Sequence, residues 1–573
     1  MNKPLKVFII LTIIGLTIYS NSFQGEFCSD DEVIIVNNYA VRNITHLKEI
    51  WDSFNTRFLV GLSFALNYRL GELNVSGYHI FNFFSHIVAA YLVYWFVLLT
   101  LQTPAIKEKF QYQDTHLIAL FSSLVFLCHP IQTQGVAYVT QRAVSMATSF
   151  YLATLLFYIK ARLDRKPIYY LGGFISMLLG MLTKEMTLTI PLTLVAYEFF
   201  FFESWQKDKR GIPKILIGFI LISGLLPLIL MQDLRGSALE LKYKIVSHSF
   251  SMHYFLTEIN ALRTYLRLLF LPFFLRHDYD YPIVQKVFEG PLILSFLLLL
   301  TVFIFGVLSF KERRLISFSI IWFFITTSVE AGVVCFAHQG VIYEHWVYLA
   351  MVGFSLFLTT GLMALLKDMR RLKFTLTGII IIFCILTYER NKVWHSCLNL
   401  WQDVARYGHK KALPYNNIGI AYSRKGYYFG AIEHYLKALQ IQKDLDPEEK
   451  ATIFVNLGST YGKLGDFDRE IEYSQTAIDY NPKNFVAYSN LGLALIEKGQ
   501  YDDGIKYSRM ALKLNSKYAN AYNNIGLAYA KRGNFDQAIS LFTEAVHFDS
   551  SNKTAKNNLT LAYEKKDEQN KKK

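Results

Sequence analysis

Long apolar runs separated by short polar connections occupy the chain up to about residue 390. A run of about 20 apolar residues is long enough to cross a bilayer as a helix. The segment 256–275 is also apolar, but it contains Glu258, Arg263 and Arg267 and is predicted to be an amphipathic or re-entrant element of a long outer loop, 232–290. The remaining runs predict about 11 spans, near residues 5–22, 78–101, 115–131, 142–160, 168–183, 186–203, 212–231, 291–309, 315–335, 345–366 and 372–389.

Basic residues cluster after every second apolar run. Because Lys and Arg accumulate in cytoplasmic loops, these connections are predicted to face the cytoplasm. The N-terminal run, which no small-x-small cleavage site follows, then reads as a retained signal anchor with a cytoplasmic N-terminus. The clusters are Lys107/Lys109, Lys160/Arg162/Arg165/Lys166, Lys207/Lys209/Arg210/Lys214, Lys311/Arg313/Arg314 and Lys367/Arg370/Arg371/Lys373.

The other connections carry residues capable of chemistry, and the same rule predicts that they face outward. Such an arrangement suggests an active site that is open to a periplasm or lumen. These outer connections contain Asp30-Asp31, His129-Pro130, Lys184-Glu185, Asp278-Tyr279-Asp280 and Glu344-His345.

A different pattern begins at residue 413, where Asn-x-Gly motifs recur. The step between Asn456, Asn490 and Asn524 is 34 residues, which is the period of the tetratricopeptide repeat. We expect four repeats and a terminal helix near 554–566, followed by a charged, disordered tail. The predicted domains are therefore a membrane domain over 1–390, a connecting segment over 391–412, repeats over 413–566 and a tail over 567–573. The fold class is all-α, a polytopic membrane domain followed by an α-solenoid.

Each repeat has an Asn two positions before its Gly. On a stacked solenoid these side chains would form a ladder that can bind the peptide groups of an extended polypeptide, whatever its sequence. The alternative, that Asn is simply frequent at this repeat position, is equally compatible with the pattern. The five residues are Asn417, Asn456, Asn490, Asn524 and Asn558.

Composition agrees with a membrane protein. Hydrophobic residues make up 52% of the chain and charged residues only 18%, which is too apolar for an ordinary soluble protein of this length. The net charge of +14 is explained by cytoplasmic loops and a Lys-rich C-terminus, so no nucleic-acid partner is expected. The five Cys show no CxxC spacing, and neither a zinc site nor a disulfide framework is predicted.

Insertion into a membrane does not by itself explain several of the polar residues. The adjacent Asp30 and Asp31 could supply a general base, and Lys184 or Arg142 could bind a lipid phosphate. His79 lies on one helical face with Asn82 and His86, of which we expect His86 to be structural. Taken singly, each is better explained by loop solvation, helix–helix hydrogen bonds or a neighbouring ion pair. Together, on one face, they favour a functional site.

Together, these motifs resemble the transmembrane and tetratricopeptide repeat-containing O-mannosyltransferases and their bacterial relatives, members of the C-type glycosyltransferase superfamily. The resemblance covers nearly the whole chain. One departure is Arg57-Phe58-Leu59, where relatives often have Arg-Pro-Leu. The motifs that carry the resemblance are Asp30-Asp31, Gly77-Tyr78-His79 with Asn82 and His86, His129-Pro130-Ile131-Gln132-Thr133, Lys184-Glu185, Asp278-Tyr279-Asp280-Tyr281-Pro282, and Glu344-His345 with Tyr348-Leu349.

The resemblance implies a polyprenyl-phosphate-linked sugar, typically mannose, that is transferred with inversion to a Ser or Thr hydroxyl of an acceptor protein bound by the repeats. It implies Asp30 or Asp31 as the base, no cofactor, and a divalent cation near them only as a disfavoured option. Membrane lipids surround the enzyme, which we expect in a bacterial inner membrane with periplasmic repeats, or in the endoplasmic reticulum if eukaryotic. Residues implied for the donor are His79, His129, Arg142, Lys184, Glu185, Asp278, Tyr279, Glu344 and His345.

Two other classes of function compete with a transferase. A non-catalytic membrane anchor would explain the repeats but would leave the outer residues without a role. A transporter is disfavoured because the polar residues lie at one face and not near the bilayer midplane.

Overall fold

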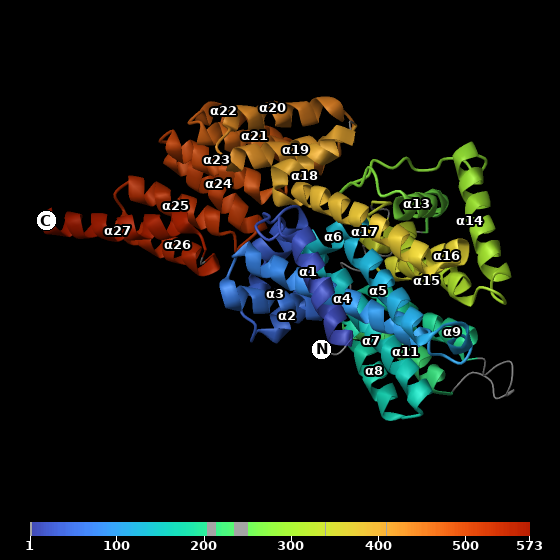
Figure 1. The fold of residues 1–573 in the computed structure, drawn as a ribbon. Helices are drawn as coiled ribbons and strands as arrows, with labels where there is room; N and C mark the ends of the chain where they lie inside the picture. The colour runs from blue at the N-terminus through green and yellow to red at the C-terminus, as the bar shows by residue number, and fades with distance from the viewer. Residues whose placement is uncertain are drawn as a thin grey trace. The chain divides into compact units, whose positions relative to one another are not determined.

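The computed structural model describes residues 3–202, 214–233, 250–337, 340–407, 410–549 and 551–572. Over these residues the regular secondary structure is entirely helical, as the sequence predicted. The chain divides into two compact units, Met1–Leu400 and Trp401–Lys573 (Figure 1). The boundary falls later than the predicted end of the membrane domain at residue 390, because the segment after α17 still packs on the first unit.

Each predicted span coincides with a helix of the first unit. Lys207, Lys209 and Arg210 of a predicted cytoplasmic cluster, and part of the predicted outer loop, lie outside the described residues. The helices are α1 (Lys3–Tyr19), α4 (Val75–Thr100), α5 (Tyr112–Cys128), α7 (Arg142–Asp164), α8 (Ile168–Met181), α9 (Ile190–Phe201), α11 (Lys214–Asp233), α14 (Gly290–Leu308), α15 (Arg314–Ala337), α16 (Ala350–Leu366) and α17 (Met369–Asn391).

By length and apolar composition, five stretches of helix among the described residues could cross a membrane, or six if the bent pair Asp114–Cys128 and Pro130–Ala137 counts as one span. Several other helices are apolar but short, among them α8 and α16. Helix α9 is also short, and it would cross a bilayer only together with the turn that flanks it. The count of about 11 spans therefore stays a prediction.

Helix α4 lies inside the bundle, packed against α1, α5 and α7 (Figure 1). Its inner face contributes Phe96, which contacts the fully buried Trp322 of α15 with ring centroids 5.5 Å apart. Helix α14 is different, because apolar side chains such as Leu294 and Leu308 remain exposed along it. An apolar surface of this kind is suited to lipid.

Helix α13 (Met252–Phe270) is the predicted amphipathic segment, and it is not among the candidate spans. It packs against the connection that follows it and against the segment that precedes α16. The Thr257 hydroxyl accepts a hydrogen bond from the amide of Val284 at 2.9 Å, and the Tyr265 hydroxyl donates to the carbonyl of Tyr343 at 3.2 Å. This placement agrees with an element that lies along the predicted outer end of the bundle.

The second unit contains four helix pairs and a terminal helix. The pairs are α19/α20 (Ala412–Arg424, Tyr428–Ile441), α21/α22 (Pro447–Lys463, Phe467–Tyr480), α23/α24 (Phe485–Glu497, Tyr501–Leu514) and α25/α26 (Ala519–Lys531, Phe535–Phe548). Helix α27 (Lys553–Lys572) runs through the segment that was expected to be a disordered tail. Its last turns are supported by the ion pair between Lys565 and Glu568.

Small residues let the two helices of each repeat approach closely. A Cβ on Gly419 would lie 2.5 Å from the Tyr435 ring, and one on Gly526 would lie 2.8 Å from the Phe542 ring. Neighbouring repeats are joined by ion pairs, for example Lys531 with Glu497 at 2.7 Å. The repeats therefore depend on both close packing and nearest-neighbour contacts, as solenoids do.

Candidate functional site

The predicted outer connections contact one another at one end of the first unit. The segment that carries the two aspartates is bound to two others, the connection after α5 and the segment after α17. The amide of Thr140 donates to Asp31 Oδ1 at 2.8 Å, and the amide of Glu26 donates to the carbonyl of His395 at 3.2 Å. Residues that are far apart in the sequence are thus brought into one cluster.

Asp31 holds the cluster together. Its Oδ2 accepts a hydrogen bond from the amide of Cys28 at 3.1 Å, so both carboxylate oxygens are bound by backbone amides. The side chain is 1% exposed. Burial, partly opposed by these hydrogen bonds, raises the pKa of Asp31 from 3.8 to about 7. Asp31 is therefore enclosed by the protein and is suited to hold the turn in position.

Asp30 is exposed, in contrast to its neighbour. Its amide donates to the Tyr138 hydroxyl at 2.9 Å, which holds the backbone in place while the carboxylate faces outward. Burial, together with the charges of Asp278 and Asp30, raises the pKa of Tyr343 above its ordinary value. Asp30 therefore lies within electrostatic range of the connection that contains Asp278.

A disulfide joins Cys28 to Cys397, with Cα atoms 5.3 Å apart and a separation of 369 positions in the sequence. The expectation that no disulfide framework exists was wrong for this pair, because cysteine spacing along the chain says nothing about such a distant contact. The bond ties the turn that carries the aspartates to the start of α18 (Cys397–Tyr407). Disulfides persist in oxidising compartments, which agrees with the predicted outward orientation of this end.

Gln134 links two of the predicted connections. Its Oε1 accepts hydrogen bonds from the amide of His345 at 2.8 Å and from His345 Nδ1 at 3.1 Å. Its Nε2 lies 3.3 Å from both Nδ1 and the carbonyl of His277. Burial and the charge of Arg390 lower the pKa of His277 to about 4, so this imidazole is neutral at physiological pH.

Glu344 and Tyr279 form a second contact between connections. The Tyr279 hydroxyl donates to Glu344 Oε1 at 2.7 Å, and the amide of Arg276 donates to the same oxygen. Both side chains are buried, Glu344 completely. Two of the predicted donor residues thus meet directly, in a contact that fixes the connection over 271–289 to the short turn Glu344–Val347 before α16.

Arg142 is fully buried and already occupied. Its guanidinium donates to Asn82 Oδ1 at 2.9 Å, to Asn67 Oδ1 at 2.7 Å, to Ser63 Oγ and to the carbonyl of Tyr78. It also lies over the ring of Phe64 at 4.3 Å. An arginine with this many neutral partners orients the helices around it.

The histidines differ in how completely they are bonded. His129 donates from Nε2 to the carbonyl of Leu269 at 3.0 Å and accepts from the amide of Ile131 at Nδ1, so both nitrogens are used. His86 contacts the Tyr348 hydroxyl at 2.5 Å and the carbonyl of Leu127. His79 contacts the carbonyl of Gly25 at 3.2 Å, while its buried Nδ1 has no hydrogen-bond partner among the described residues.

Lys184 and Glu185 do not pair with each other. Lys184 Nζ lies 3.2 Å from Glu330 Oε1, and both side chains are buried. Both oxygens of Glu185 accept from Arg57, each at 3.1 Å, so the departure at Arg57-Phe58-Leu59 leaves this arginine in a two-point ion pair. Glu330 was not among the predicted site residues, although a carboxylate inside a predicted span is the kind of signal that marks an intramembrane ion pair.

The Asn ladder contributes to contacts between repeats. The Asn456 amide donates to Asn416 Oδ1 at 3.0 Å, the Asn524 amide to Ser489, and the Asn558 amide to Asn523 Oδ1 at 2.9 Å. No side-chain hydrogen bond of Asn417 or Asn490 is found within the described ranges. The repeat position therefore has a structural use, and binding of a peptide by these residues stays a prediction.

One group of acidic, Cys and His side chains is close enough to hold a metal ion among the residues that the structure describes. It consists of Glu26, Cys28 and Cys397. Since the two sulfurs form the disulfide, the group offers only one carboxylate to a metal. The expectation that Asp30 and Asp31 act without a metal stays a prediction.

Residues 410–483 and 484–549 match the tetratricopeptide repeat family model. The crystal structures of MamA (25% identical, covering 27% of this chain and 86% of that one) and of the tetratricopeptide protein YrrB (20% identical, covering 35% and 96%) match with TM-scores of 0.23. Likeness at that TM-score says nothing further about this chain.

The curated relatives cover much more of the chain. Protein O-mannosyl-transferase F38B6.6 of Caenorhabditis elegans is 25% identical over 77% of this chain, and human TMTC3 is 22% identical over 81%. Mouse TMTC4 is 25% identical over 75%. The chain spans 63%, 54% and 66% of the length of these three relatives. They confirm the resemblance that the motifs predicted, and this chain is similar over most of its length to the transmembrane and tetratricopeptide repeat-containing O-mannosyl-transferases.

Proposed function

We propose that this protein is a membrane glycosyltransferase that moves mannose from a polyprenyl-phosphate carrier to a Ser or Thr hydroxyl of a protein on the non-cytoplasmic face. The observation that carries the proposal is the exposed Asp30 carboxylate, held on a turn that Asp31, Tyr138 and the Cys28–Cys397 disulfide fix in place. The names of the relatives supply the sugar and the reaction class. The carrier and the side of the membrane are our extension.

Asp30 has the access that a general base needs. An acceptor hydroxyl is too weak an acid to ionise before it reacts, so its proton must leave as its oxygen attacks the anomeric carbon. The Asp30 carboxylate would take that proton while the bond between the anomeric carbon and the phosphate oxygen breaks. The carrier phosphate leaves with the bonding electron pair, and a single displacement inverts the anomeric centre. Asp31, enclosed by protein with both oxygens bonded, would position the turn.

The cations proposed for the phosphate differ in availability. Arg142 and His129 have their donors occupied by neutral partners, and Lys184 is paired with Glu330. Asp278, Tyr279, Glu344 and His345 lie in the connections around Asp30 and are better placed to shape the sugar site than to neutralise a phosphate. The phosphate therefore needs a cation from another part of the first unit.

Transfer by the purified protein tests the proposal directly. Protein in detergent is mixed with polyprenyl-phosphate mannose and an unfolded Ser/Thr-rich acceptor, and mannosylated acceptor is measured by mass spectrometry. We expect transfer from the polyprenyl-phosphate donor and none from a nucleotide-linked mannose, because a lipid carrier presents its sugar at the membrane surface. Transfer from the nucleotide sugar alone would refute the carrier. Absence of transfer from any donor would favour the alternative of a non-catalytic repeat scaffold.

Acceptor binding by the Asn ladder is tested at Asn417 and Asn490, for which no hydrogen bond between repeats is found within the described ranges. Replacing Asn417 and Asn490 with Ala should weaken transfer to a long unfolded acceptor by about tenfold, because each lost hydrogen bond is worth roughly 0.5–1.5 kcal/mol. Transfer to a short Ser/Thr peptide, which cannot span two repeats, should not change. Acceptor KM is measured for both substrates.

Asn524→Ala is the matched control for this experiment. It removes the bonds to Ser489 and is expected to lower the melting temperature of the repeats, whereas the Asn417 and Asn490 changes leave the inter-repeat bonds of Asn456, Asn524 and Asn558 intact. If the Asn417/Asn490 variant has the KM of the native protein for both acceptors, the ladder serves repeat packing alone.

A further inference from the structure

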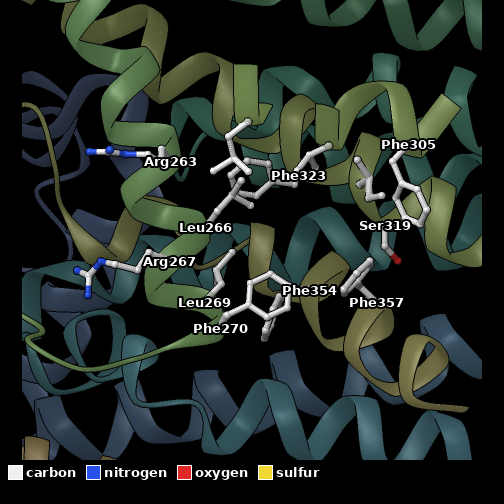
Figure 2. A pocket seen from close by; sticks show the side chains of 13 residues that line it. Arg263, Leu266, Arg267, Leu269, Phe270, Phe305, Ser319, Phe323, Phe354 and Phe357 are labelled. Carbon is white, nitrogen blue, oxygen red and sulfur yellow. The ribbon is translucent and has the colours of Figure 1, made fainter. Parts of the chain in front are cut away.

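An apolar groove of about 360 Å³ lies between α13, α14, α15 and α16 (Figure 2). Leu266 and Phe270 line it from α13, Val302 and Phe305 from α14, Phe323 from α15 and Phe357 from α16. Nearly all of its wall is carbon. A groove of this kind can hold a hydrocarbon chain, because burying apolar surface is favourable and no polar group is left unsatisfied.

The groove continues along the helices. A second hollow of about 380 Å³ shares Phe270, Phe305 and Phe357 with the first and reaches Leu365 and Arg313, near the far end of α16. From Phe354 to Leu365 the helix rises about 16 Å at 1.5 Å per residue. The two hollows together follow α16, and their combined length suits an extended hydrocarbon chain.

Two arginines of α13 lie at the border of the groove. Arg263 and Arg267 are four positions apart and so lie on the same side of the helix. Figure 2 shows both guanidinium groups pointing the same way, away from the phenylalanines of the groove. Arg267 Nη1 lies 3.4 Å from the carbonyl of Phe273, and the described residues show no ion pair of either arginine with a carboxylate. Paired guanidinium groups are suited to phosphate oxygens.

The groove also touches the connection that positions Asp31. The carbonyl of Leu269, a groove residue, accepts the hydrogen bond of His129, and the ring of Phe354 lies 5.8 Å from the His129 ring. His129 begins the connection whose Thr140 amide binds Asp31. A molecule whose chain fills the groove would therefore have its head group at the end of the bundle that carries the candidate base.

We propose that this groove binds the polyprenyl chain of the donor and that Arg263 and Arg267 bind its phosphate. The inference rests on the proposed function, since it names where that donor would lie, and the apolar groove and its two cationic residues are complementary to a single-chain lipid with one anionic end. The two arginines would also supply the cation for the phosphate, which Arg142 and Lys184 do not supply because they already have partners.

Binding is measured on the full-length protein in detergent, without any transfer step, using a long-chain polyprenyl phosphate. Polyprenol without the phosphate and phosphatidylglycerol serve as comparison lipids. Replacing Arg263 and Arg267 with Gln should weaken binding of the polyprenyl phosphate on the order of a hundredfold, to the level of polyprenol, because two charge-assisted contacts are lost. Leu298→Trp, which fills the groove from α14, should weaken binding of both polyprenyl lipids.

Leu294→Trp is the matched control, because Leu294 is exposed on the same helix and does not line the groove. It should bind as the native protein does. Native binding in the double Arg variant or in Leu298→Trp would overturn the site, and so would binding of phosphatidylglycerol as tight as that of the polyprenyl phosphate. If the groove binds as expected but the native protein transfers no sugar, the proposed transferase function fails and the lipid site stands.

Discussion

Asp30→Asn is expected to reduce the rate of mannose transfer by about 100- to 10,000-fold, which is the usual contribution of a general base. Asn keeps the shape of the side chain and removes its ability to take the acceptor's proton. Because Asp30 is exposed and is held through its backbone amide, the change should leave the melting temperature unaltered. The measurement is kcat with saturating polyprenyl-phosphate mannose, together with a melting curve in the same detergent.

Asp31→Asn separates the base from the residue that positions it. An Asn at 31 can still accept one backbone amide, but its NH2 group faces the other amide donor, so the turn should loosen and the protein should melt earlier. Its rate should fall less than that of Asp30→Asn. If instead Asp31→Asn abolishes transfer at an unchanged melting temperature while Asp30→Asn is active, the two roles are reversed.

Removal of the Cys28–Cys397 disulfide is expected to affect both stability and rate. Replacing both residues with Ser should destabilise the first unit by about 2–5 kcal/mol, because the bond closes a very long loop. It should also slow transfer by up to about 100-fold, since the freed turn would carry Asp30 away from its working position. Melting temperature and transfer rate are measured with and without a thiol reductant.

The variant itself supplies the control. Reductant should lower the melting temperature and the rate of the native protein but should have no further effect on the double Ser variant. The free Cys128 and Cys384 remain in both proteins, so any effect through them would appear in the variant as well. A native enzyme that is indifferent to reductant would show that the disulfide does not support the site.

The helices and repeats were predictable because their signals are local. Each apolar run that predicted a span became a helix, and the 34-residue period predicted the helix pairs. The amphipathic character of α13 was visible in Glu258, Arg263 and Arg267, which interrupt its apolar stretch. These features depend on residues a few positions apart, where the sequence determines the structure most directly.

The partners of the site residues were not predictable, because they depend on contacts between distant segments. Lys184 was next to a carboxylate in the sequence yet pairs with Glu330, and Arg142 looked like a phosphate ligand yet is bonded by Asn82 and Asn67. Residue type shows that a buried cation needs partners. Only the packing of the helices shows which partners it has.

The Cys28–Cys397 bond makes most of the first unit a covalent ring. A break in the peptide chain anywhere between the two cysteines would leave the N-terminal segment and the repeats on the same molecule, joined through sulfur. A cut in the short segment between α17 and Cys397 would therefore leave the repeats joined to the first unit through sulfur. Such a cut would free the repeats only together with reduction, whereas a cut after residue 397 would free them alone.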